Sequence, residues 1–280
     1  GADGGGEGDQ FEQAAPGVSS ADPAKPRRMT SPGIVHEVDI DGPATHVFLV
    51  GIGYYPHLEG GDKKKAALDF GLGQLSSTSA SARRLADWFI QNFDCPERPL
   101  ATVSLLLSEP GVKAASHVHP VTGHASEVPR GTKTETRDAL IAALDRVASP
   151  DDQFIFYLAA HGLSGGVNNF YLLRDFGVDP FDPFDAMINY SRLMAAMRTR
   201  LPTQQFLVFD ACRDVQDIVA ANQDGGTGLI HADPAIRLVA DDLVDAEIGD
   251  LIGQRHPEIV DRQADPAPRR EDQAGRERLG

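Results

Sequence analysis

Two residues that can do covalent chemistry, His161 and Cys212, each follow a short apolar run. His161 follows residues 153–160 (QFIFYLAA), and Cys212 follows the run at 205–209 (QFLVF) after two intervening residues, Asp210 and Ala211. The thiolate is the reactive form of cysteine, and a neighbouring imidazole can generate it by taking the thiol proton. If the fold brings both side chains together, the pair predicts nucleophilic attack on an acyl carbon.

The segments around these residues must position them. Short apolar runs bounded by turn residues indicate strands buried on both faces, and amphipathic segments between them indicate helices. We expect strands at 47–52, 102–107, 153–160 and 205–209, and helices at 79–93, 134–147 (opened by Thr134) and 190–201. This alternation predicts an α/β fold with a mostly parallel central sheet flanked by helices. Ligands bind beyond the carboxyl ends of such strands, so neighbouring strands would bring His161 and Cys212 to one edge.

Three further regions complete the expected organisation. Residues 1–42 are rich in glycine, proline, alanine and serine and predict a disordered arm or linker, with a short strand possible at 34–40. Residues 110–132 predict a loop, and 170–173 one arm of a small hairpin. The expected folded domain is 43–253, clear to about 215, with an acidic helix possible at 236–252. Residues 254–280 predict a charged flexible tail.

Composition limits the classes of function. The net charge of −15 argues against nucleic acid or an anionic membrane as the main partner. No apolar run approaches the roughly 20 residues of a membrane span. Glycine motifs for nucleotide phosphates do not occur, since Gly51-Ile52-Gly53 lacks the third glycine. Two cysteines make no disulfide framework, so we expect a reducing, cytoplasmic setting, with Cys95 a buried core residue.

The strand ends Ala160-His161-Gly162 and Asp210-Ala211-Cys212-Arg213 resemble those of the caspase and metacaspase superfamily of cysteine peptidases, in particular bacterial caspase-like domains. The 51-residue spacing is close to the roughly 50 typical of caspases. The resemblance covers residues 46 to about 213. It implies a three-layer sandwich and a His161–Cys212 dyad that needs no cofactor.

The oxyanion of such a reaction needs hydrogen-bond donors. Gly162 leaves the backbone free to approach a substrate, so its N–H and that of Cys212 are the predicted donors. Caspases carry glutamine two residues before the nucleophile, where this chain has Asp210, as metacaspases do. By that likeness, a buried Asp210 carboxylate would bind a basic side chain, and cleavage would follow Arg or Lys.

A second departure from the family lies after residue 215, where only 215–221 and 228–232 are candidates for the strands that complete the substrate groove. Two other functions remain open: a catalytically inactive caspase-like interaction module, and an unrelated doubly wound domain that binds a small anion. By resemblance, the expected partner is a protein or peptide substrate in stress or antiviral cell-death defence. The arm and tail agree with a larger multidomain or multiprotein assembly.

Two clusters raise the question of a metal. His117, His119, His124 and Glu127 have a spacing that could hold zinc, but they include no cysteine ligand and favour a solvated loop. The acids Asp175, Asp179, Asp182 and Asp185 could bind calcium, on which some metacaspases depend, but they lack the calcium-loop spacing. We expect no metal, an acidic loop facing a basic substrate, and a solvated charge cluster at 63–65.

Overall fold

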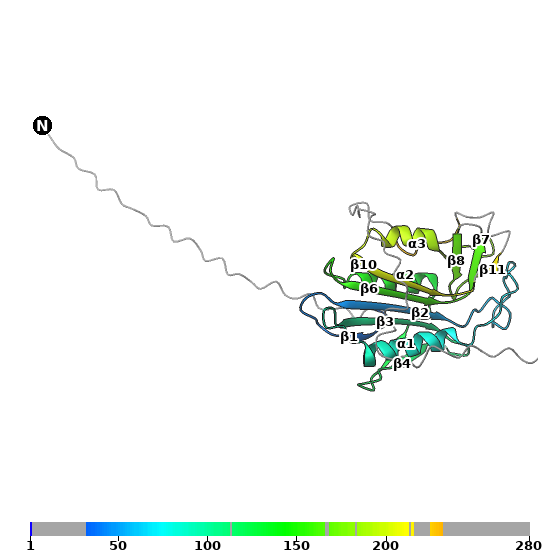
Figure 1. Cartoon of the computed structure of the whole chain (residues 1–280). Coiled ribbons are helices and arrows are strands. Elements are labelled where there is room, and N and C mark those ends of the chain that lie inside the picture. Colours follow the sequence, from blue (N-terminus) through cyan, green and yellow to red (C-terminus); the bar gives the residue numbers. More distant parts are fainter. Residues whose placement is uncertain are drawn as a thin grey trace, which may run out of the picture. The chain divides into compact units, whose positions relative to one another are not determined.

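The computed structural model describes residues 1, 32–112, 114–165, 168–182, 184–212, 214–215 (backbone alone) and 225–231. Most of the predicted arm, the possible helix at 236–252 and the predicted tail lie outside these residues. The elements, shown in Figure 1, are β1 (Ile34–Glu37), β2 (Thr45–Ile52), α1 (Thr78–Asn92), β3 (Leu100–Ser108), β4 (Ala115–Val118), β5 (Ala125–Val128), α2 (Lys133–Leu144), β6 (Gln153–Ala159), β7 (Gly162–Gly165), β8 (Asn168–Leu172), β9 (Met187–Asn189), α3 (Tyr190–Met197), β10 (Gln204–Asp210) and β11 (Asp214–Val215).

The main sheet has five strands in the order β1-β3-β2-β6-β10. The neighbours β3, β2, β6 and β10 run parallel, and β1 pairs antiparallel with β3 at one side. Every residue of β2 and β6 is buried, which explains their continuous apolar sequences. The expectation of a mostly parallel central sheet is confirmed, and so is the possible strand at 34–40, which is β1.

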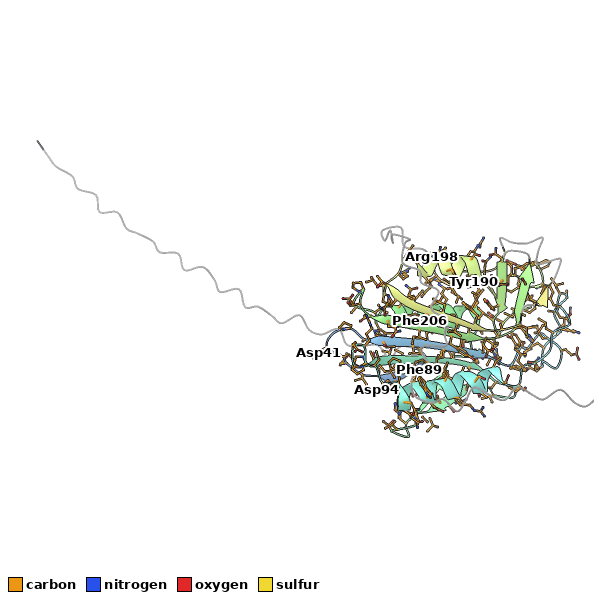
Figure 2. All side chains as sticks on the ribbon, viewed as in Figure 1. Asp41, Phe89, Asp94, Tyr190, Arg198 and Phe206 are labelled. Carbon is orange, nitrogen blue, oxygen red and sulfur yellow. The ribbon has the colours of Figure 1, made fainter. Side chains whose placement is uncertain are left out.

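Helices cover both faces of this sheet (Figure 1). On one face α1 buries Ala82, Ala86 and Phe89 against the strands, and Figure 2 shows Phe89 among the side chains that fill this layer. On the other face α2 and α3 contribute to a second core, with Leu140 and Leu193 fully buried. None of the helices in the described ranges is long and apolar enough to cross a membrane.

A second, smaller sheet has the order β11-β7-β8-β9. β7 begins directly after His161 and forms a hairpin with β8, while β11 pairs in parallel with β7. The hairpin arm expected at 170–173 is therefore β8. After Val215, the described residues add an isolated bridge between Ile188 and Thr227, and residues 216–224 lie outside the described ranges.

The sequence-based expectations were wrong at several points. Residues 115–128 form the antiparallel hairpin β4–β5 within the predicted loop, because Ala115, His117 and Val128 face inward. The helices expected to end at residues 147 and 201 end at Leu144 and Met197. In addition, α2 is opened by Thr132, whose side chain accepts from the Glu135 N–H while the Glu135 side chain accepts from the Thr132 N–H. This reciprocal pair is a capping box, which satisfies two donors that the helix itself leaves unpaired.

Candidate active site

The registers of β6 with β10 and of β7 with β11 put His161 and Cys212 at the same level. Ala159 pairs with Asp210 at the ends of the parallel strands β6 and β10, and Leu163 pairs with Asp214 in the second sheet. The members of each pair are 51 residues apart, which is also the separation of His161 and Cys212. The structure therefore brings both residues together between two in-register pairings, at the carboxyl edge of the main sheet.

The two cysteines lie in different surroundings. Cys212 is exposed, as a nucleophile must be to meet a substrate. Cys95 is half-buried in the loop after α1, with its Sγ 3.8 Å from a Glu97 carboxylate oxygen. The expectation that Cys95 belongs to the core is wrong: its segment follows the end of α1, where the chain turns outward.

The imidazole of His161 has a fixed orientation. Its Nε2 lies 2.8 Å from the carbonyl oxygen of Gly73, in the loop between β2 and α1. A carbonyl oxygen accepts hydrogen bonds only, so Nε2 carries the proton and a neutral His161 has its lone pair on Nδ1. Burial lowers the pKa of His161, and the Gly73 carbonyl partly opposes that shift. The neutral, proton-accepting form is therefore favoured at neutral pH.

Tyr55 supports the chain at His161. The tyrosine is fully buried, and its hydroxyl accepts a 2.9 Å hydrogen bond from the His161 N–H and lies 3.4 Å from the carbonyl oxygen of Leu172. The rings of Tyr55 and His161 lie 5.1 Å apart between centroids. Burial raises the pKa of Tyr55, so its hydroxyl stays protonated and can both donate and accept.

Asp210 lies at the end of β10, and its Oδ2 accepts a 2.9 Å hydrogen bond from the hydroxyl of Tyr157 on the neighbouring strand. Burial, followed by this contact with Asp210, raises the pKa of Tyr157. Asp210 itself is exposed, so the expectation that its carboxylate is buried is wrong. That expectation came from the likeness to metacaspases, whereas β10 is the last strand on its side of the described sheet.

Gly162 starts β7 and lies directly beside Cys212. A Cβ atom on Gly162 would overlap the carbonyl oxygen of Cys212 and come within 3.1 Å of the Ala211 Cβ. Glycine is needed here for the close approach of two backbone segments. From the sequence we expected glycine at 162 for another reason, namely to let a substrate approach the backbone. The role of the Gly162 and Cys212 N–H groups as oxyanion donors remains a prediction.

The histidines considered for zinc are not arranged around a common point. His117 is buried with its Nε2 2.9 Å from an Asp87 carboxylate oxygen, so the expectation of a solvated loop is wrong for this residue. His119 Nδ1 accepts from the Val121 and Thr122 N–H groups, which leaves the proton on Nε2, facing His36 Nδ1 at 3.1 Å. Among the described residues no group of three or more histidine, cysteine or acidic side chains could hold a metal ion.

The acids considered for calcium have separate partners. Asp175 accepts from the Lys133 N–H, Asp185 forms an ion pair with the Lys133 side chain, and Asp179 and Asp182 accept backbone N–H groups of their own loop. These contacts are typical of turns and helix caps. They explain the acidic residues without a cation.

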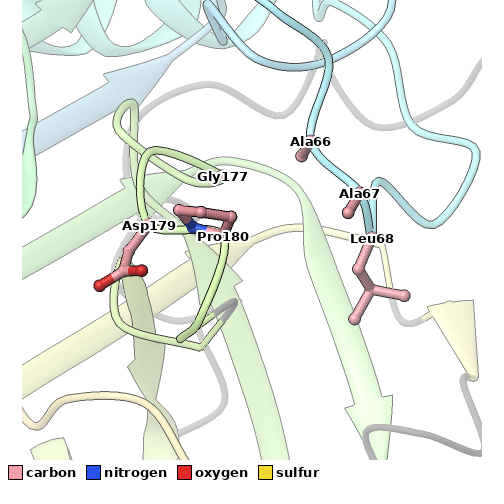
Figure 3. A pocket seen from close by; sticks show the side chains of 6 residues that line it. All are labelled: Ala66, Ala67, Leu68, Gly177, Asp179 and Pro180. Atoms are coloured by element: carbon pink, nitrogen blue, oxygen red, sulfur yellow. The ribbon is translucent and has the colours of Figure 1, made fainter.

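A small pocket lies between the loop after β2 and the loop after β8, and its volume is about 50 Å³ (Figure 3). It is lined by Ala66, Ala67, Leu68, Gly177, Asp179 and Pro180, so neither dyad residue contributes to it. Lys63, Lys64 and Lys65 are exposed nearby, and Lys65 pairs with Glu59 and Asp69, as expected for a solvated charge cluster.

Sequence reasoning missed the two residues that hold His161, Tyr55 and Gly73. They belong to one loop, residues 53–77, which follows the carboxyl end of β2 and so reaches the same edge as the dyad. The position of that loop was a usable signal. Nothing in the sequence pointed to Gly73 in particular, because Gly73 contacts His161 through its backbone carbonyl, a group that every residue has.

No protein-family model matches the chain. A protein of Sinorhizobium fredii (strain NBRC 101917 / NGR234), described as "Uncharacterized protein y4kE", is 26% identical over 157 residues. The match includes 52% of this chain and 45% of that protein, so the chain spans less than half of the relative's length.

Proposed function

We propose that the chain is a caspase-like cysteine endopeptidase with His161 and Cys212 as its catalytic dyad. The observation that carries the proposal is the register of the two strand ends. It brings the backbones of His161 and Cys212 to the same level at the edge where parallel sheets bind ligands. The exposed thiol of Cys212 and the Gly73-held imidazole of His161 support the proposal. The mostly parallel sheet covered by helices on both faces supports the likeness to caspases.

The proposed reaction has two steps. His161 Nδ1 accepts the proton of the Cys212 thiol, and the sulfur attacks the scissile carbonyl carbon, with the Gly162 and Cys212 N–H groups as donors to the oxyanion. His161 gives the proton to the leaving amine as the C–N bond breaks and a thioester remains. A water molecule then hydrolyses the thioester and restores the thiol.

We propose cleavage after Arg or Lys. Asp210 is exposed and lies two residues before Cys212, and the Tyr157 hydroxyl holds one of its carboxylate oxygens. We propose that a guanidinium or ammonium group binds the other oxygen. Because this carboxylate is exposed, its attraction for a basic residue is screened by water. We therefore expect the preference for basic substrates to weaken as the salt concentration rises.

The test is turnover of fluorogenic peptides ending in Arg, Lys or Asp, measured with and without calcium. The wild-type chain is compared with Cys212→Ala, and with Cys95→Ser as the matched control for loss of a thiol. Turnover of the basic peptides that vanishes in Cys212→Ala and persists in Cys95→Ser would support the proposal. Faster cleavage after Asp would overturn the specificity.

An inactive interaction module is the alternative outcome. The wild-type chain would then show no turnover, and a peptide with a thiol-reactive end group would not label Cys212. Labelling of Cys212 that is lost in His161→Ala supports the dyad even where the chosen peptides are poor substrates, because it reports thiol reactivity directly.

A further inference from the structure

Gln74 makes three hydrogen bonds with its side-chain amide. Its Oε1 accepts from the Tyr55 N–H at 2.7 Å, and its Nε2 donates to the carbonyl oxygens of Tyr55, at 3.0 Å, and Glu59, at 2.9 Å. The amide thus pairs with both backbone groups of Tyr55, much as a neighbouring strand would. A surface glutamine that only contacts solvent would not show this arrangement.

Gly73, the residue before Gln74, lies in a segment that hydrogen bonds hold on both sides. Backbone hydrogen bonds flank this point, from the Glu59 N–H to the Leu72 carbonyl and from the Leu75 N–H to the Gly53 carbonyl. Gly73 lies between them, and its carbonyl oxygen is the partner of His161 Nε2. A Cβ on Gly73 would have no atom closer than 3.7 Å, so tight packing does not hold this residue. Gly73 is instead held in place by the hydrogen bonds of its neighbours Leu72 and Leu75.

We propose that Gln74 is a positioning residue for the dyad: its amide joins Tyr55 to the Gly73 segment, so that the two groups that hold His161 act as one unit. Tyr55 holds the His161 backbone through its hydroxyl, and Gly73 holds the imidazole through its carbonyl. The Gln74 amide is bonded to the backbone of the first and adjoins the second. The inference rests on the proposed function, because it assigns a purpose to the orientation of His161.

The chemical consequence concerns the tautomer of His161. While the Gly73 carbonyl accepts from Nε2, the neutral imidazole keeps its lone pair on Nδ1. Without that acceptor, neutral imidazole distributes its proton between both nitrogens, and only one of the two forms presents a base at Nδ1. Displacements of about 1 Å in a positioning group can lower a rate by up to about 100-fold.

The test uses Gln74→Met, which keeps the length of the side chain and removes all three hydrogen bonds. Nitrogen-15 NMR of the histidine rings, with His161 assigned from a His161→Gln spectrum, reports the tautomer directly. We expect a single Nε2–H form in the wild type and a mixture in Gln74→Met. In a Cys95→Ser background, alkylation of Cys212 by iodoacetamide at neutral pH should slow about tenfold.

Two controls separate positioning from general loss of stability. Gln91→Met removes an exposed glutamine of α1, and Thr132→Ala destabilises α2 without touching the loop at 53–77. Both should keep the wild-type tautomer and alkylation rate. An Nε2–H form that persists in Gln74→Met, or that is lost equally in Thr132→Ala, would overturn the inference. Neither readout needs peptide turnover, so failure of the proposed function and failure of this inference are distinguishable.

Discussion

The carbonyl oxygen of Cys212 lies against the α-carbon of Gly162, at a distance that leaves no room for a side chain. This contact joins Gly162, the residue after His161, to Cys212 itself. Any group added at 162 must therefore displace the backbone of Cys212.

Gly162→Ala is expected to lower the free energy of unfolding by about 1–3 kcal/mol, the usual effect of overpacking at a buried site. It should also slow labelling of Cys212 by iodoacetamide, because the backbone of that residue must shift. Urea unfolding and the labelling rate measure the two effects. Gly73→Ala is the control for stability alone, since a Cβ there meets ordinary contact distances. Wild-type stability and labelling in Gly162→Ala would contradict the described packing.

Tyr157→Phe removes the hydroxyl that holds Asp210. A hydrogen bond at this position contributes about 1 kcal/mol to stability, so the variant should fold. If Asp210 receives a basic side chain, kcat/KM for Arg-ended peptides should fall several-fold, while Asp210→Asn should lower it much further because the charge is lost. Equal kcat/KM values in the wild type and Asp210→Asn would exclude Asp210 from substrate recognition.

Stability is expected to decrease as the pH falls below 6.5. Burial lowers the pKa values of His36, His46 and His161 from the ordinary value of 6.5. Below pH 6.5 the unfolded chain therefore binds more protons than the folded chain, and stability is lost down through the folded pKa values. Each such group can contribute up to about 1.4 kcal/mol per pH unit. Urea unfolding at pH 7.5, 6.5 and 5.5 measures this dependence.

His36 provides the variant for that experiment. Its Nδ1 faces the Nε2–H of His119, and an asparagine oxygen at position 36 can accept in its place without titrating. His36→Asn should reduce the loss of stability between pH 6.5 and 5.5, while His231→Gln, at an exposed position, should not. A pH dependence that is unchanged in His36→Asn would show that this histidine is not held neutral by the fold.

The capping box of α2 predicts different effects for two helix N-caps. Thr132→Ala removes a side-chain acceptor for the Glu135 N–H and should destabilise the protein by about 1–2 kcal/mol. Ser77 occupies the equivalent position at α1 but makes no side-chain cap, so Ser77→Ala should have little effect. The difference between the two free energies of unfolding is the measurement. Similar values for the two variants would contradict the assignment.

The sequence predicted the main strands well and the edges of the fold poorly. β2, β3 and β6 are buried apolar runs because helices cover both faces of the sheet, and this pattern is readable without a structure. β10, at the end of the described sheet, carries an apolar run that is only half-buried. The β4–β5 hairpin was missed because one of its inward positions is occupied by His117. That side chain is buried through an interaction with Asp87, which lies 30 residues away in the sequence. Polar residues that are satisfied by distant partners look like loop residues in a sequence.

The candidate site, too, was predictable only in part. His161 and Cys212 could be found because reactive side chains follow buried strands. The residue that holds the His161 imidazole could not, because Gly73 acts through its carbonyl. The exposure of Asp210 was also beyond the sequence, since it depends on which strand lies at the end of the described sheet.

Both chain segments that carry the dyad pass from the main sheet to the small sheet at the same point. β6 leads into β7 through His161, β10 leads toward β11 through Cys212, and the two segments pair with each other before and after the crossing. Separating His161 from Cys212 would therefore require breaking strand pairs in two sheets at once. A movement of the small sheet would therefore carry His161 and Cys212 together and leave the distance between their backbones unchanged.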